Sequence, residues 1–577
     1  PMAKTAAPRT DLRDDLHRVP FCRHGSWWHL VCPPRPHMQP VGPGLYLRSN
    51  RLARLGRREL LKLELLADDE VVPHRATARP HLLELRPQRG DGRIEFLFVG
   101  EAGAHARGRG VGLRLRAPGG FGQVVTATPD GRLVITQHDT QRRCVLAVRG
   151  GRFVVDAPWR TEGCEHITID VRQDGDAAWE LTLEEVESTW PAPAAPDFAR
   201  RVSRCQAEWE AFRAPFGRYP RRWAAAVDFA IHILWSFTVP PCGLLRRPTV
   251  LMARGWMDAV WSWDNWFNLC ALAAPHPRLA LDQALLMTDH QDEHGCYPDV
   301  VAAPYRFYIF HKPPTQGVLL RWLRTHAPQF LTPAVRRRLY PTLAAFTNWW
   351  ITARRWPGLR LCHYLHGNDA GWDNATLFDG GVPVESPDLA ALITVQADEL
   401  AALADSLGKR RAAAEWRATA DAFAAALVEE LWDGDGFAAH VLSTGQRCRS
   451  RSLIGCLPLV LGPRLAPPQR RALVRRVRGL LTPHGVASEP LDSPAYEDDG
   501  YWRGPVWGAS TLLIVCGLAA CGETALARTI AQRFCDTCAQ SGFAENYDAR
   551  TGVGYRDPAY SWTASCFLAL LPYAGRS

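Results

Sequence analysis

The chain has 577 residues, of which 47% are hydrophobic and 22% charged, and its formal net charge is +9. This length is more than one hydrophobic core organises, so two or three domains are expected, and the composition is that of a folded globular protein. The positive charge comes almost entirely from arginines that are scattered or paired with acids, which excludes the basic stripe of a nucleic-acid-binding protein.

The sequence shows neither a membrane segment nor a secretion signal. No apolar run approaches the roughly 20 residues that span a bilayer. The opening residues, PMAKTAAPRTDLRDD, lack the apolar core and small-residue cleavage site of a signal peptide. The 16 cysteines have no regular spacing, which favours free thiols in a reducing compartment. We therefore expect a cytoplasmic protein without membrane or nucleic-acid partners, and its oligomeric state stays open.

The first part of the chain consists of short segments in which apolar and polar residues alternate. Examples are GRIEFLFVG at 92–100 and HITIDVRQDGDAAWELTLEE at 166–185. Alternation with a period of two, cut by Gly and Asp turns, predicts an antiparallel β-sandwich over residues 41–188. Residues 1–40 are expected to pack on this domain. No acid of the predicted sandwich lies in an aromatic, glycine-bounded loop, so we expect a packing domain without catalytic carboxyl groups.

The second part of the chain changes to the 3.6-residue period of helices after a Pro- and Ala-rich stretch, 189–200, which is expected to be a linker. The segment from Pro387 to the terminating Gly408 is an example of an amphipathic helix with recognisable ends. Helix pairs with short connections over residues 201–577 predict a mainly α catalytic domain, an (α/α)6 toroid. A helical solenoid is the alternative, but no repeat of fixed period is visible.

Aromatic residues and acids gather where the predicted helices meet loops. These clusters are RGWMDAVWSWDNWFN at 254–268, HKPPTQG at 311–317, HGNDAGWDNATLFDGG at 366–381, YEDDGYWRGPVW at 496–507 and GFAENYDARTGVGYRDPAYSWTAS at 542–565. A tryptophan ring stacks on the apolar face of a pyranose while carboxylates accept hydrogen bonds from its hydroxyls. Tryptophans at helical spacing are more often core residues, but Trp263, beside Asp264, and Trp372, in a loop beside Asp373, favour a sugar site.

Hydrolysis of a glycosidic bond requires two carboxyl groups, one as acid and one as base or nucleophile. Asp373 and Glu545 are the best pair, because each lies in a glycine-bounded loop beside aromatic residues that raise a pKa by excluding water. A single acidic loop residue can also be a turn or capping residue, and we interpret Asp369 and Asp379 in that way.

The motifs GWDNA, SPDL, YWRGPVW and FAENYDARTG…YSWTA, in this order and spacing, resemble glycoside hydrolase family 63. They resemble more distantly the trehalases of the same inverting (α/α)6 clan. WSWDNWF is similar to the family's first helix-end motif, and RVPFCRHGSWWHL resembles the opening of members with an N-terminal β-domain. The likeness therefore spans most of the chain and is least specific between residues 41 and 200.

The resemblance implies that Asp373 is the general acid and Glu545 the general base that activates water. Trp263 and Asp264 would bind the non-reducing sugar in the −1 subsite. The residues that would complete the wall of this subsite are Gly371, Trp372, Trp502, Arg503 and Trp507. Related enzymes often have Gln-Pro-Pro where this chain has Lys312 and two prolines, so either Lys312 or the nearby Gln316 would reach the sugar.

These observations predict an inverting, exo-acting α-glycosidase, an α-glucosidase acting on a small α-glucoside or oligosaccharide by a single displacement. No metal or organic cofactor is expected, and the only expected partner is a small sugar substrate. A glycoside phosphorylase or a trehalase-type enzyme on a similar barrel is the alternative within enzymes. A non-catalytic carbohydrate-binding protein is the alternative outside them, although both carboxyl groups are present.

Overall fold

The computed structural model describes residues 12–189, 197–217 and 219–575 and divides into two compact units. The first unit contains the residues up to 214 together with 235–243 and 253–258, and the second contains 215–234, 244–252 and the residues from 259 onward. Most of the predicted linker lies outside the described residues, so this boundary stays a prediction. The first helix, α1 (Phe198–Arg213), begins where Asp197 accepts a hydrogen bond from the backbone N–H of Arg200.

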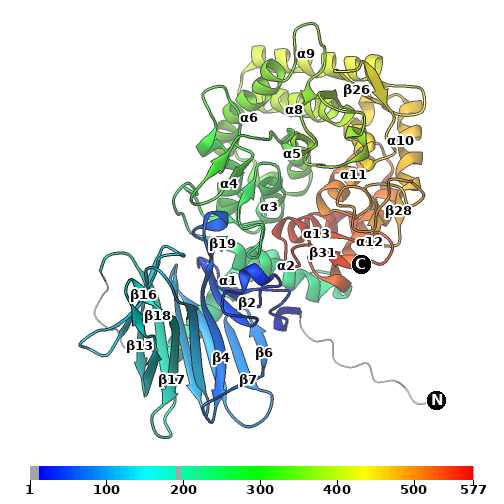
Figure 1. Ribbon diagram of the computed structural model, residues 1–577. Helices are drawn as coiled ribbons and strands as arrows, with labels where there is room; N and C mark the ends of the chain where they lie inside the picture. The colour runs from blue at the N-terminus through cyan, green and yellow to red at the C-terminus, as the bar shows by residue number, and fades with distance from the viewer. Residues whose placement is uncertain (1–11, 190–196, 218, 576–577) are drawn as a thin grey trace, which may run out of the picture. The chain divides into compact units, whose positions relative to one another are not determined.

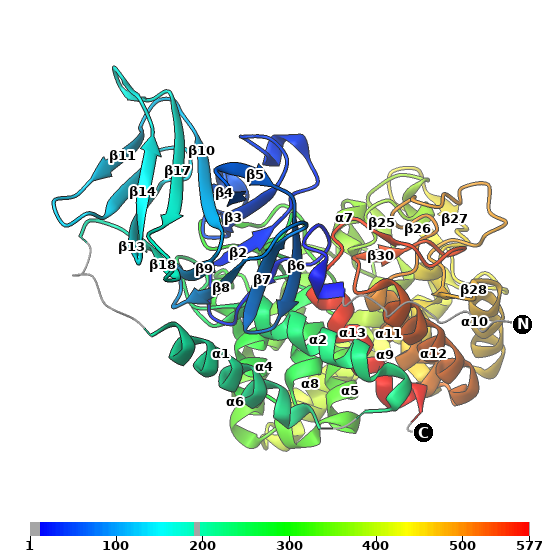
Figure 2. The same ribbon diagram turned by 90° about the horizontal axis from the view of Figure 1, so that it is seen from below.

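The first unit is an antiparallel β-sandwich of two eight-stranded sheets, as predicted (Figures 1 and 2). One sheet has the order β1 (Phe21–Cys22), β2 (Trp28–Val31), β3 (Leu45–Ser49), β4 (Glu59–Ala67), β10 (Gly112–Pro118), β17 (His166–Gln173), β14 (Gly151–Asp156), with β5 (Glu70–Val72) also on β4. The other has the order β11 (Gln123–Ala127), β12 (Leu133–Gln137), β13 (Arg142–Arg149), β18 (Trp179–Val186), β9 (Gly103–Arg109), β8 (Arg93–Val99), β7 (Leu82–Pro87), β6 (His74–Arg79). The segment expected to pack on the sandwich thus supplies two of its strands.

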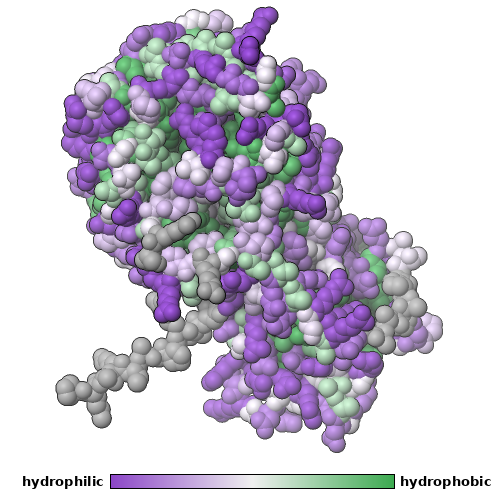
Figure 3. Space-filling view, turned by 180° about the vertical axis from the view of Figure 1, so that it is seen from behind, coloured by the Kyte–Doolittle hydropathy of each residue, from purple (hydrophilic) through white to green (hydrophobic). Residues whose placement is uncertain are grey.

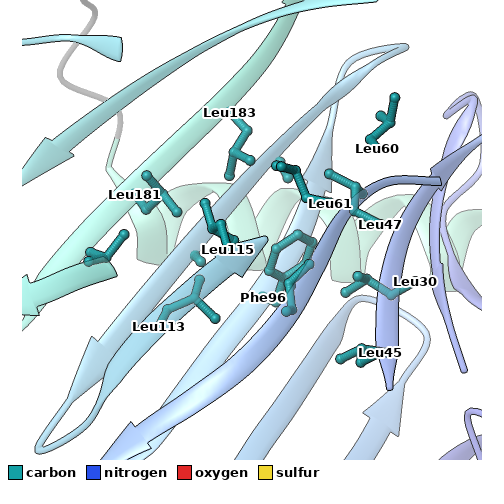
Figure 4. Close-up of a cluster of buried hydrophobic side chains, with 14 of the residues drawn as sticks. Leu30, Leu45, Leu47, Leu60, Leu61, Phe96, Leu113, Leu115, Leu181 and Leu183 are labelled. Carbon is teal, nitrogen blue, oxygen red and sulfur yellow. The ribbon is translucent and has the colours of Figure 1, made fainter. Parts of the chain in front are cut away.

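The core of the sandwich follows from the alternation of residues along its strands. In β10, Leu113 and Leu115 point inward, and Arg114 between them points outward. These leucines join Phe96, Leu181 and other buried apolar side chains between the two sheets (Figure 4). Trp179 fills one part of this core, and its indole N–H donates to the backbone oxygen of Val111 over 2.7 Å.

Two short segments from the second part of the chain belong to the first unit and hold a buried charge network. The Arg254 guanidinium donates to the backbone oxygens of Ser26 and Ser236 at 2.8 and 2.6 Å. Asp258, from the first aromatic cluster, lies 2.9 Å from the Arg58 guanidinium. Asp258 is therefore paired with arginine inside the first unit.

The second unit is a double ring of helices, the predicted (α/α)6 toroid (Figure 1). The inner layer consists of α3 (Asp264–Leu272), α5 (Gln316–His326), α8 (Pro387–Ser406), η10 (Leu453–Arg464), α11 (Gly508–Ala520) and α13 (Ser561–Ala574). The outer layer consists of α2 (Ala224–Phe237), α4 (Pro277–Leu285), α6 (Pro333–Ala353), α9 (Arg410–Ala426), α10 (Pro467–Gly479) and α12 (Thr524–Ser541). Each inner helix packs on the next in this order, and α13 returns to pack on α3, which closes the ring.

The burial of the helices matches their layer. All residues of α3 and nearly all of α13 are buried, since neighbours cover these inner helices on every side. The outer helix α9 buries one stripe, which includes Trp416 and Phe423, and exposes the remainder. The inner segment η10 is a 3-10 helix, and the non-helical backbone of Gly462 (φ 57°, ψ −119°) interrupts it just before Pro463.

Short strands and one short helix occupy the remaining connections, two of them between β14 and β17 of the sandwich and the others between helices. They are α7 (Gly367–Ala370), β15 (Trp159–Arg160), β16 (Gly163–Cys164), β19 (Thr238–Val239), β20 (Thr249–Val250), β21 (Val260–Trp261), β22 (Val300–Val301), β23 (Arg306–Phe307), β24 (His363–Tyr364), β25 (Val384–Glu385), β26 (Ala439–Val441), β27 (Gln446–Cys448), β28 (Leu481–Thr482), β29 (Gly485–Val486), β30 (Asn546–Tyr547) and β31 (Gly554–Tyr555). Within the described parts of the chain, no helix is long and apolar enough to cross a bilayer. Hydrophilic and apolar residues are interspersed on the face drawn in Figure 3.

Candidate active site

The predicted site residues gather at one end of the helical ring, all within the second unit. Asp264 is the first residue of α3, Gln316 the first of α5, and Trp507 immediately precedes α11. Since the inner helices of such a ring run in the same direction, their first residues share one end. Figure 2 shows α7, β25, β26 and β30 on one side of the ring. Of these elements, α7 and β25 flank the segment that carries Asp373, and β30 begins directly after Glu545.

The loop that carries Asp373 depends on two glycines. Helix α7 ends at Gly371, whose φ of 74° is left-handed. A Cβ on Gly371 would lie 2.5 Å from Cζ2 of Trp263, and one on Gly367 would lie 2.1 Å from the backbone oxygen of Asp373. Both positions therefore exclude any larger residue, and the loop packs directly against the first aromatic motif.

Asn374, the residue after Asp373, fastens this loop to the YWRGPVW motif. Its side chain donates to the backbone oxygen of Gly500 and accepts from the backbone N–H of Trp502, each over 3.0 Å. Arg503 donates to the backbone oxygen of Asn374 over 2.8 Å and forms an ion pair with Asp379. Arg503, predicted as part of the sugar wall, has its guanidinium engaged in holding the Asp373 loop.

Asp369 has a larger structural role than the predicted turn residue. Its side chain is 1% exposed and accepts from the backbone N–H groups of His311 and Leu365 at 2.9 and 2.8 Å. The guanidinium of Arg354 donates to the same carboxylate over 3.1 Å. Asp369 therefore ties the loop before α5 to the loop that carries Asp373.

The four predicted tryptophans form one packed block. The rings of Trp502 and Trp507 are stacked at 4.1 Å between centroids, and Trp372 lies 4.4 Å from Trp502. Trp263 contacts Trp502 at 6.4 Å and a further ring, Trp562, at 5.2 Å. Each of the four predicted tryptophans is at most 2% exposed. The block gives the site a rigid aromatic wall, and which of these rings would contact a sugar stays a prediction.

Burial raises the pKa values of the three predicted site acids. The pKa of Asp264 lies well above its usual range because the group is buried, and the charges of Asp299 and Glu545 raise it further while Lys312 lowers it. Burial also raises the pKa of Asp373, again opposed by Lys312. The pKa of Glu545 rises to about 8, chiefly through burial and then through the charge of Asp557.

Asp373 and Glu545 belong to one electrostatic cluster, because the charge of Asp373 contributes to the raised pKa of Glu545. The ionisation of Glu545 is therefore coupled to that of Asp373. A pair that holds one proton near neutral pH is what acid and base catalysis requires. With the roles implied by the resemblance, the productive arrangement places that proton on Asp373 and leaves Glu545 ionised.

The sequence did not predict that Tyr501 and Arg556 lie next to the site acids. Both have a φ of 64°, a left-handed conformation that is uncommon for residues other than glycine. The Arg556 guanidinium lies 4.7 Å from the centre of the Tyr501 ring. The pKa of the Tyr501 hydroxyl lies well above its usual range through burial and the charges of Asp373 and Glu545. Tyr501 is part of the YWRGPVW motif, so the sequence indicated its place in the chain. The residue types of the motif do not predict the left-handed backbone conformation that Tyr501 adopts beside the acids.

Gln316, a predicted sugar-binding residue, is the first residue of α5 and is 1% exposed. Its side-chain oxygen has no hydrogen-bond partner among the described residues. Within the same described residues, no group of three or more His, Cys, Asp or Glu side chains could hold a metal ion.

A closed double ring of helices with buried acids and tryptophans at the start of its inner helices defines a glycoside hydrolase of the (α/α)6 type. Comparison with known proteins gives the particular family. The chain belongs to the mannosylglycerate hydrolase MGH1-like glycoside hydrolase domain family, whose sequence profile matches residues 257–563. The predicted membership of glycoside hydrolase family 63 is thereby confirmed.

Individual relatives agree with this assignment. The mannosylglycerate hydrolase MGH1 of Selaginella moellendorffii is 24% identical over 402 residues, which cover 55% of this chain and 81% of the relative. The crystal structure of a family 63 mannosylglycerate hydrolase from Thermus thermophilus in complex with glucose matches with a TM-score of 0.52 and 21% identity, over 60% of this chain and 99% of that one. A bacterial glucoamylase complexed with acarbose matches with a TM-score of 0.60 and 11% identity, over 99% of this chain and 95% of that one. The last two similarities concern the fold.

The hydrogen bonds of Asn374 predict a loss of activity without loss of the fold. In Asn374→Ala the Asp373 loop loses both side-chain bonds to the 500–502 segment, and a misplacement of about 1 Å costs about 100-fold in rate. We expect kcat on the best substrate to fall about 10- to 100-fold with a nearly unchanged Tm. Asn348→Ala, on the exposed face of α6, is the control. Wild-type kcat in Asn374→Ala would contradict the proposed role of these bonds.

The raised pKa of Glu545 predicts the alkaline limit of activity. Above about pH 8 the pair loses its last proton, so kcat/KM should decline there. Asp557→Asn removes a negative charge that raises the Glu545 pKa, so the alkaline limb should move to lower pH by up to about one unit. Asp498→Asn, at an exposed ion pair with Arg550, should leave the pH profile unchanged. An alkaline limb in Asp557→Asn at the wild-type position or higher would contradict this account.

Proposed function

We propose that this glycoside hydrolase is an inverting, exo-acting α-glycosidase that releases one sugar from a small α-glycoside. Mannosylglycerate and glucosylglycerate are the leading substrates. The observation that carries the proposal is the family match, since residues 257–563 include Asp264, Asp373 and Glu545. The curated relatives are named mannosylglycerate hydrolases, which favours a mannosyl or glucosyl group on a hydroxy acid over the α-glucosidase substrate first expected.

The proposed mechanism is a single displacement. Asp373 donates its proton to the leaving glycosidic oxygen while Glu545 removes a proton from a water that attacks the anomeric carbon from the opposite face. Trp263 and Asp264 would bind the sugar at this carbon. Only carboxyl groups and water take part in these steps.

The surroundings of the acids support this distribution of roles once substrate is present. The Asp373 loop is fixed by Gly371, Asn374 and Arg503, as required of an acid that must meet one oxygen. A leaving oxygen within hydrogen-bonding distance would favour the protonated form of Asp373. A water held by Glu545 would favour its ionised form, and together these contacts would produce the productive arrangement.

Exo-action is proposed from the packing of the tryptophans. A block in which every ring packs on another closes one side of a subsite, whereas an endo-acting enzyme needs an open groove with separate stacking platforms.

The prediction that the first unit carries no catalytic carboxyl group is supported by the location of all three predicted site acids in the second unit.

A glycoside phosphorylase is the competing enzyme class. Inorganic phosphate would then replace the activated water, and the base carboxyl group would be unnecessary. The buried, electrostatically coupled Glu545 favours hydrolysis.

We also propose a reducing, cytoplasmic location, supported by the sixteen cysteines, all of which are free thiols.

Replacing either carboxyl group by its amide should remove most of the turnover. Proton transfer by one positioned group is worth about 100- to 10,000-fold, so Asp373→Asn and Glu545→Gln should lower kcat by at least about 100-fold. Sugar binding and Tm should change little, because the amides keep the shape of the side chains. Asp435→Asn and Glu415→Gln, in exposed positions, are matched controls. Wild-type turnover in either amide variant would show that the residue has another role.

The initial product should be the β-anomer of the released sugar. Inversion at an α-linked anomeric carbon gives this anomer before mutarotation, and proton NMR during the first minutes of reaction detects it. The substrates to compare are mannosylglycerate, glucosylglycerate, trehalose, kojibiose, nigerose and maltose, each with and without inorganic phosphate. Early appearance of the α-anomer would mean a retaining mechanism, and a sugar phosphate as product would establish the phosphorylase.

A further inference from the structure

Lys312 is a buried lysine placed among buried acids. The residue is 7% exposed, and its ammonium nitrogen lies 3.4 Å from Oδ1 of Asp299, a residue that is 6% exposed. The same nitrogen donates a hydrogen bond to the backbone oxygen of Asn368. Burying a lysine is costly unless it is paired, so these two contacts account for its position.

The two partners of Lys312 belong to different segments of the site. Asn368 lies in α7, five residues before Asp373. Asp299 is hydrogen-bonded to the first aromatic motif, because its backbone oxygen accepts from the backbone N–H of Ser262, the residue before Trp263. Lys312 therefore links the segment that carries the predicted acid to the segment that carries the predicted sugar-binding residues.

Lys312 is also the cation shared by three buried carboxyl groups. Burial raises the pKa values of Asp264, Asp373 and Asp299, and in each case the charge of Lys312 opposes the rise. The pKa of Asp299 is about 6 despite this opposition.

Further charged groups face these acids from neighbouring elements. Glu545 acts on Asp264, Asp369 and Asp373 act on Asp299, and His366 acts on Asp373. Asp369 is itself neutralised by Arg354 at 3.1 Å. Lys312 is thus the side chain whose charge reaches all three acids in common.

We propose that Lys312 is a positioning residue for the hydrolysis, which braces the Asp373 loop against Asp299 and offsets the negative charge of the site, and that it does not bind the sugar. This inference rests on the proposed function where it concerns turnover, and on the contacts alone where it concerns the brace. It assigns a purpose to the lysine at a position where related enzymes often have glutamine. A glutamine can donate to a backbone oxygen but cannot neutralise a carboxylate.

The kinetic test compares Lys312→Met, Lys312→Gln and Lys312→Arg on the best substrate. Loss of the charge should lower kcat about 10- to 100-fold in the Met and Gln variants and leave KM within about threefold. The pH profile should move upward, because the charge of Lys312 that lowers the pKa of Asp373 is gone. Arginine should restore part of kcat and the pH profile. Lys62→Met removes the other described buried lysine, paired with Glu64 at 2.6 Å in the sandwich, and should change none of these values.

A different kinetic result would overturn the proposal. If Lys312→Met raised KM tenfold or more with wild-type kcat and an unshifted pH profile, Lys312 would be a sugar-binding residue. Equal activity in the Met, Gln and wild-type proteins would exclude both roles.

Thermal unfolding tests the brace independently of any substrate. The pKa of Asp299 is about 6 in the folded protein and about 3.9 in an unfolded chain, so ionisation of Asp299 lowers stability as pH rises through this interval. Without Lys312 the folded pKa rises further, and stability continues to fall above pH 6. The Tm deficit of Lys312→Met relative to wild type should therefore be larger at pH 8 than at pH 5, by about 2–4 °C.

A second variant keeps this measurement decisive if Lys312→Met folds poorly at pH 8. Lys312→Met combined with Asp299→Asn removes both charges and should recover most of the lost Tm. A Tm deficit that is equal at both pH values, or no recovery in the double variant, would overturn the brace. If no α-glycoside is hydrolysed while the pH-dependent deficit is present, the proposed function fails and the brace stands.

Discussion

Closure of the inner helical ring is the constraint on which the site depends. Because α13 returns to pack on α3, the connections that lead into α3, α5, α8, α11 and α13 meet over one end of a closed wall. Segments more than 280 residues apart in the sequence, such as those of Asp264 and Glu545, are thereby brought into one electrostatic environment. The same closure excludes water, and exclusion of water raises the pKa values of the acids.

Burial raises the pKa values of the acids, which suits acid and base catalysis, but it also makes their ionised forms unfavourable for the stability of the fold. An isolated ionised carboxylate away from water is strongly unfavourable, so such groups are either protonated or compensated. The site uses both solutions. Glu545 keeps its proton to higher pH, while Asp369 is compensated by Arg354 and by backbone N–H donors. The residues that hold the site loops in place, such as Arg354 and Asp369, therefore also balance the charge of the site.

Much of the fold was accessible from the sequence because it follows from periodicity. Alternation predicted strands such as β8 and β17, and the 3.6-residue period predicted helices such as α8, whose start at Pro387 was predicted. The clusters of the site were accessible because their tryptophans and acids are unusual in loops. What the sequence could not supply was geometry. The left-handed backbone of Tyr501 depends on long-range packing, and the pairing of Arg503 with Asp379 joins residues 124 positions apart.

The 3-10 conformation of η10 makes one of the six inner walls unlike the others. In a 3-10 helix, side chains three residues apart eclipse one another, whereas in an α-helix they advance around the axis. Leu453, Cys456 and Leu459, all at most 1% exposed, therefore stand in a straight file along the wall. At about 2.0 Å per residue, the nine residues before Gly462 extend roughly 18 Å, the reach of a twelve-residue α-helix. A short, proline-containing segment can thus span the ring with fewer residues than an α-helix needs. A substitution that changes the volume of Leu453, Cys456 or Leu459 acts directly on the side chain three residues before or after it.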